Sequence, residues 1–139
     1  MHDEVAGGLV EEFRGQLVKT TGDGVLAIFD GPGRAIRCAA AFRDELTGIG
    51  LSIRAGLHTG EIELRDGDVG GIAVHITARV MAAAGSGQIL ASRTVRDLVV
   101  GSDIAMDDLG TRSLKGVEGP VRLYRARRLV RDEDAEAAA

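Results

Sequence analysis

Glycine interrupts this sequence so often that no long uninterrupted element is expected. The chain has 139 residues, of which 20 are glycine and 2 are proline. Glycine suits tight turns and helix ends because it tolerates positive φ angles that other residues avoid. We therefore expect short helices and strands joined by tight turns, in one domain of ordinary size.

Hydrophobic periodicity predicts the order of these elements. Val5, Leu9 and Phe13 recur at helical spacing, which predicts a helix at the start of the chain. Because predicted hairpins alternate with helices, the order favours an α+β fold in which helices pack on a mostly antiparallel sheet. The same patterns predict further helices at 34–47, 72–84 and 92–100, the last capped by Ser92, and strands at 16–20, 25–29, 51–58, 61–64, 88–91, 104–109, 112–115 and 121–126.

Composition and charge exclude several function classes. The chain carries 17 basic and 21 acidic residues, a net charge of −4, which argues against nucleic acid or an anionic membrane surface as partner. No apolar run reaches the roughly 18 residues of a membrane span, and the start lacks a signal-peptide pattern, so we expect a cytoplasmic location. Cys38 has no second cysteine with which to pair. We assign one domain to 1–127 and a solvated acidic tail to 128–139.

Four polar stretches stand out from the packing pattern. They are Val-Lys-Thr-Thr-Gly-Asp-Gly at 18–24, Arg-Ala-Gly-Leu-His-Thr-Gly at 54–60, the segment 68–80, and Leu-Lys-Gly at 114–116. Asp23 occupies the predicted tip of the first hairpin, four residues after Lys19. Within 68–80, His75 and Arg79 are one helical turn apart and so share a helix face.

Together these stretches resemble the catalytic domain of the class III nucleotide cyclases, in the style of bacterial and especially actinobacterial adenylate cyclases. The resemblance covers about residues 3–126. It implies a ferredoxin-like fold and the conversion of ATP to cyclic AMP and pyrophosphate in cyclic-nucleotide signalling. It also implies two divalent ions, Mg or Mn, held by two aspartates, which activate the ribose 3′-hydroxyl and neutralise the phosphates.

The resemblance gives two residues a base-reading role and one a metal-binding role. Asp23 matches the second of the family's two metal-binding aspartates. Lys19 matches the lysine that reads the base, and Asp68 matches its base-reading partner. A lysine can only donate and an ionised aspartate can only accept, which suits N1 and the N6 amino group of adenine and not the reversed pattern of guanine.

Three further matches concern the phosphates and the ribose. Arg79 matches the family arginine that stabilises charge on the transferring phosphate, a role suited to its planar fork of donors. His75 stands where the family usually has Asn, and its imidazole can still donate one hydrogen bond toward the ribose. Lys115 matches a lysine that contacts the triphosphate.

Each of these residues also has a purely structural explanation. An Asp-Gly pair such as Asp23-Gly24 is common in hairpin turns without any catalysis. Lys19 alone would pass for a solvent-facing strand residue, and Asp68 for a cap of the following helix. His75 could be a hydrogen-bonded helix histidine and Arg79 one half of a surface ion pair.

The family's opening strand, Phe-x-Asp-Ile-x-x-Phe-Thr, has no counterpart in these residues, and neither has the helix that follows it. Its Asp is the first metal ligand in the family. We therefore expect a ferredoxin-like cyclase fold lacking its first strand and helix, with unpaired sheet edges that favour a homodimer. Two functions stay open: an adenylate cyclase of impaired activity, or a degenerate cyclase domain that binds nucleotide or dimerises without turnover.

Overall fold

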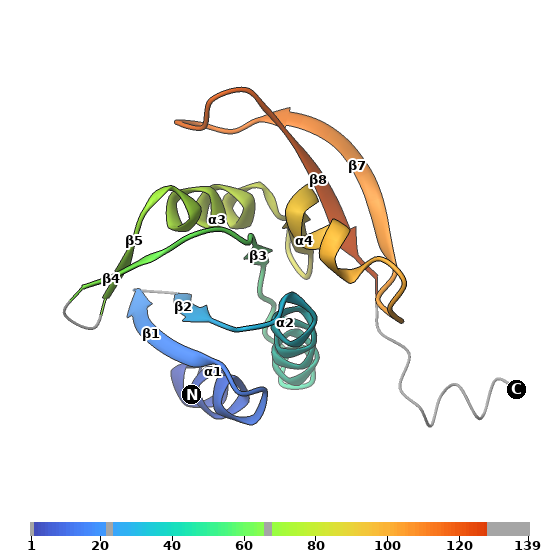
Figure 1. Ribbon diagram of the computed structural model, residues 1–139. Helices are drawn as coiled ribbons and strands as arrows, with labels where there is room; N and C mark the ends of the chain where they lie inside the picture. The colour runs from blue at the N-terminus through green and yellow to red at the C-terminus, as the bar shows by residue number, and fades with distance from the viewer. Residues whose placement is uncertain (1, 22–23, 66–67, 128–139) are drawn as a thin grey trace, which may run out of the picture.

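The computed structural model describes residues 2–21, 24–65 and 68–127. In these ranges the chain forms helices and strands in the mixed order of an α+β fold, which confirms the predicted fold class (Figure 1). The helices are α1 (His2–Glu12), α2 (Pro32–Thr47), α3 (Ile72–Ala83) and α4 (Arg93–Val99). The strands are β1 (Gln16–Thr21), β2 (Gly24–Ile28), β3 (Ala55–Leu57), β4 (Glu63–Arg65), β5 (Asp68–Gly70), β6 (Ile89–Ser92), β7 (Met106–Ser113) and β8 (Pro120–Ala126).

The strands of the described residues form three separate hydrogen-bonded groups. A four-stranded sheet has the order β3-β6-β8-β7, in which only the β3–β6 pair is parallel. The hairpin β1–β2 and the hairpin β4–β5 are each antiparallel and each form a two-stranded sheet. The four-stranded sheet therefore ends at β3, while β2 belongs to a different sheet.

The first predicted hairpin is confirmed, with one irregularity. Lys19 pairs with Leu26 and Thr20 with Val25, in antiparallel register. The register shifts between Leu17 and Lys19, so the strand has a bulge at that point. A bulge adds one residue to one strand, and it changes which face the following side chains occupy.

Three strand predictions need correction. The strand predicted at 51–58 is shortened to β3, because among the described residues the ladder with β6 spans only Ala55–Leu57. The strands predicted at 104–109 and 112–115 form one strand, β7, in which the register shifts around Gly110 at φ +81°. A positive φ at a bulge interrupts the alternation of side chains, which is why the sequence pattern suggested two strands. The hairpin partner β5 was not predicted at all.

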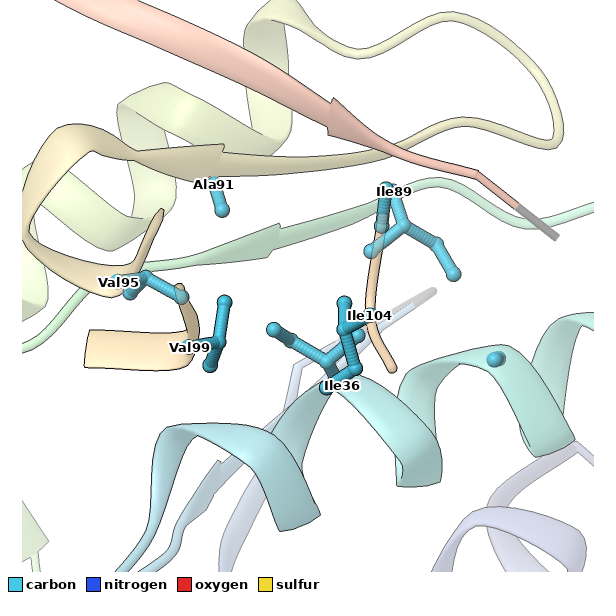
Figure 2. Close-up of a cluster of buried hydrophobic side chains, with 8 residues drawn as sticks. Ile36, Ile89, Ala91, Val95, Val99 and Ile104 are labelled. Carbon is cyan, nitrogen blue, oxygen red and sulfur yellow. The ribbon is translucent and has the colours of Figure 1, made fainter. Parts of the chain in front are cut away.

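The main core lies between α2, α4 and the four-stranded sheet. Ile36 of α2 faces Ile89 and Ala91 of β6, with Val95 and Val99 of α4 beside them, as Figure 2 shows. Ile104 from the segment before β7 completes this cluster. A second cluster on the other side joins Val80 of α3, and Ala84 just after this helix, to Leu90 and Leu123. Adjacent residues of β6 thus serve both clusters, because side chains alternate between the faces of a strand.

Glycine sets the distance between β3 and α3. A Cβ atom built on Gly56 would lie 2.6 Å from the backbone Cα of Met81, closer than real contacts allow. The strand and the helix therefore approach each other at a point where no side chain fits. Among the described residues, no helix combines the length and the apolar character needed to cross a membrane.

Candidate active site

The predicted site residues lie on three elements, β1, β5 and α3, and β5 contacts both of the others in space. Strand β1, which carries Lys19, contacts β5, whose first residue is Asp68. Strand β5 contacts α3 and leads into it through Gly71, which has φ +110°. Helix α3 carries His75 and Arg79, both half-buried. The elements that carry Lys19, Asp68 and Arg79 therefore follow one another in space, with β1 beside β5 and β5 beside α3 (Figure 1).

His75 connects α3 to the turn between β7 and β8. Its Nε2 donates a hydrogen bond to the carbonyl oxygen of Gly116, at 3.2 Å. Gly116 has φ +75°, and a Cβ there would lie 2.9 Å from that Nε2, so only glycine suits the position. Lys115, exposed to solvent, precedes Gly116 in the turn. The third and fourth polar stretches of the sequence therefore meet in space, although 41 residues separate the two bonded residues.

The contact with Gly116 gives His75 a structural role that the sequence did not suggest. With Nε2 directed at the Gly116 carbonyl, the imidazole positions the turn that carries Lys115. No sequence pattern predicted this bond, because nothing in a chain marks a pair 41 residues apart. In a neutral ring whose Nε2–H goes to Gly116, Nδ1 can only accept. A hydrogen bond between His75 and the ribose would therefore be donated by a ribose hydroxyl, and it stays a proposal.

A second histidine lies in a polar cluster that the sequence did not predict. His58 Nδ1 lies 2.6 Å from Ser92 Oγ and 3.4 Å from Thr94 Oγ1, and the two hydroxyl groups lie 2.9 Å apart. Burial lowers the pKa of His58 below its usual value. Ser92 was expected to cap α4 with its side chain. It stands at the N-cap position without a capping hydrogen bond, because its Oγ is engaged with His58 and Thr94.

The expected metal site lies mostly outside the described part of the chain. Asp23, the one carboxylate assigned to a metal, falls outside the described residues. Within them, no group of three or more His, Cys, Asp or Glu side chains lies close enough together to hold a metal ion. The described residues alone therefore supply no such cluster, and Asp23 stays the proposed metal ligand.

Comparison with known proteins defines the class. The chain shares 32% identity with an adenylate/guanylate cyclase/hydrolase from Silicibacter pomeroyi of known structure, covering 89% of this chain and 79% of that one with a TM-score of 0.80. It is 32% identical over 130 residues to the putative adenylate cyclase 3 of Rhizobium meliloti, which covers 87% of this chain and 22% of the relative. A Trypanosoma brucei adenylate cyclase, studied in its monomeric state, has the same fold at 20% identity and a TM-score of 0.81, covering 92% of this chain and 76% of that one.

These matches establish the family. The chain belongs to the class III adenylate/guanylate cyclase domains, as the four polar stretches indicated. No family model matches it. It spans about a fifth of the length of its Rhizobium relative, so the activity of the larger protein enters only as a proposal.

Proposed function

We propose that this chain is a nucleotide cyclase domain of the adenylate type, which binds ATP through Lys19, Asp68, Arg79 and Lys115. The contact between β1 and β5 carries this proposal, because it brings the strand of Lys19 against the strand that Asp68 begins. A donor and an acceptor on neighbouring strands match the edge of adenine. The half-buried Arg79 is one helical turn from His75, whose bond to Gly116 positions the turn of Lys115.

In this proposal each residue contacts a different part of the nucleotide. Lys19 donates to the base and Asp68 accepts from it, which sets the orientation of the nucleotide. Arg79 supplies a planar set of donors to the phosphate on which negative charge develops. Lys115 adds a point charge toward the end of the triphosphate. In the family, divalent metal supplies activation of the nucleophile when bound, and Asp23 is the residue here that we propose as its ligand.

Base preference tests this proposal whether or not turnover is measurable. Titrating the full chain with ATP and with GTP at the same Mn concentration should show tighter binding of ATP by about five- to 150-fold, the range expected for polar pairs worth about 1–3 kcal/mol. Lys19→Ala should remove most of that preference, because the donor to N1 is lost. Gln16→Ala, an exposed change on the same strand, is the matched control. Equal affinity for both nucleotides, unaffected by Lys19→Ala, would refute the assignment.

The second candidate function is nucleotide binding without catalysis. It needs only the residues proposed to bind the nucleotide, Lys19, Asp68, Arg79 and Lys115, and no pair of metal-binding carboxylates. A Mn-dependent assay for cyclic AMP on the same preparation separates the candidates: ATP-selective binding with robust product supports the cyclase, and ATP-selective binding without product supports the binding module.

A further inference from the structure

Three arginines line an open cavity beyond the C-terminal end of α3. The cavity has a volume of about 350 Å³ and is lined by Arg43, Arg125 and Arg127 together with the turn Ser86, Gly87 and Gln88. That volume falls at the lower end of the range of small-molecule sites, roughly 300–1,000 Å³. Since α3 ends at Ala83, before Ser86, the helix separates this cavity from Gly71 and His75 near its start.

The arginines come from two elements that the fold brings together. Arg43 lies in α2, while Arg125 lies in β8 and Arg127 directly follows that strand. Only 14% of the Arg43 side chain is exposed. Its Nε donates to Asp44 Oδ1 at 3.2 Å, an adjacent carboxylate. A guanidinium has five N–H donors, so this single bond engages only part of its capacity.

Asp107 holds the other two arginines in place. Its Oδ2 accepts from Arg125 Nη2 at 2.8 Å, and its Oδ1 accepts from Arg127 Nε at 2.6 Å. These hydrogen bonds, the one from Arg127 first, lower the pKa of Asp107 to about 2, so it is ionised at neutral pH. One carboxylate fixes two cations, which leaves the cavity with three guanidiniums against the two carboxylates of Asp44 and Asp107. The lining therefore has an excess of positive charge in a chain of net charge −4.

We propose that this cavity binds a phosphate group of a small anion. Guanidinium groups match phosphate oxygens with paired donors, and several cations around one cavity favour an anion that carries more than one charge. A phosphate group carries about −1.5 to −2 at neutral pH, whereas a carboxylate carries a single charge. The site is separate from the proposed nucleotide site and does not depend on turnover.

Calorimetric titration of the full chain at fixed ionic strength tests the site. Inorganic phosphate, added without nucleotide or metal, should bind with one-to-one stoichiometry, and acetate should bind much more weakly. Arg43→Gln should weaken binding by tenfold or more, because a charge-assisted pair is lost. Arg93→Gln is the matched control: Arg93 is an exposed helix arginine that pairs with Asp97 and does not line the cavity. The acidic residues at 132–136 are unchanged in every variant, so they do not account for a difference in phosphate affinity between variants.

Two more variants keep the test decisive. Asp107→Asn removes the anion that competes for Arg125 and Arg127, so it should tighten phosphate binding if the cavity is the site. Arg79→Gln removes a phosphate donor of the candidate active site, so the phosphate binding that depends on Arg43 should persist in this variant. Binding that survives Arg43→Gln but is lost in Arg79→Gln would place the anion at the active site and overturn the proposal. Equal binding of phosphate and acetate, insensitive to Arg43 and Asp107, would overturn it as well.

Discussion

Single side chains in this molecule show how burial changes chemistry. His58 contacts the hydroxyl groups of Ser92 and Thr94, and Ser92 is only 3% exposed. Hydroxyl groups can satisfy a neutral imidazole but provide no negative charge to stabilise an imidazolium. The pKa of His58 is therefore lowered by burial, and the folded state favours the neutral ring.

This shift predicts a dependence of stability on pH. Because the unfolded chain binds a proton at His58 more readily than the folded chain does, the contribution is fully present above the unfolded pKa of about 6.5 and is lost as the pH falls through the lowered folded pKa. Urea unfolding between pH 7.5 and 5 should show stability falling toward acid. His58→Gln should flatten that dependence, and His2→Gln, at the first residue of α1, should not. A slope that is identical in wild type and His58→Gln would contradict the assignment.

Between elements, β3 approaches α3 closely at Gly56. A methyl group at Gly56 would meet the backbone of Met81, which cannot move away as a flexible side chain could. Gly56→Ala should therefore destabilise the protein by about 1–3 kcal/mol or more, as overpacking does in well-packed interiors. Gly8→Ala in α1, where nothing lies within 4 Å, should be neutral or stabilising by up to about 1 kcal/mol. Thermal or urea unfolding of both variants measures the difference, and equal stability of the two would refute this account.

Helices and strands with strong local signals could be predicted from the sequence, whereas pairings between distant segments could not. The hairpin β1–β2 followed from strong local signals, an Asp-Gly turn between two β-rich runs, and α2 followed from its apolar spacing and the glycine after it. The single strand β7 was missed because a bulge at Gly110 breaks the alternation that identifies strands. Pairings set by tertiary contact, such as β4 with β5 and His75 with Gly116, leave no periodic mark in the sequence. The cavity lined by Arg43, Arg125 and Arg127 could not be predicted either, because its residues come from distant segments of the chain.

At the scale of the whole molecule, the sheet edges bear on assembly. Strand β3 ends the four-stranded sheet, and the β1–β2 hairpin lies outside that sheet in the described residues. Exposed sheet edges promote pairing between chains, and we propose a homodimer of this chain. Light scattering at high micromolar concentration should give twice the monomer mass of 14.5 kDa and approach the monomer on dilution. A mass of one chain throughout that range would contradict the proposal and match the monomeric state in which the Trypanosoma brucei cyclase was studied.

The separation of the sheets has a consequence for ligand affinity. In the described part of the chain, β1 and β2 form ladder hydrogen bonds only with each other, so packing against α1 and β5 holds Lys19 in position relative to α3. A site divided in this way is complete only while the hairpin is docked against β5. A variant that loosens this docking would reduce the apparent affinity for a nucleotide that needs both parts, in proportion to the docked fraction. Any contact that increases the docked population tightens binding without touching the nucleotide.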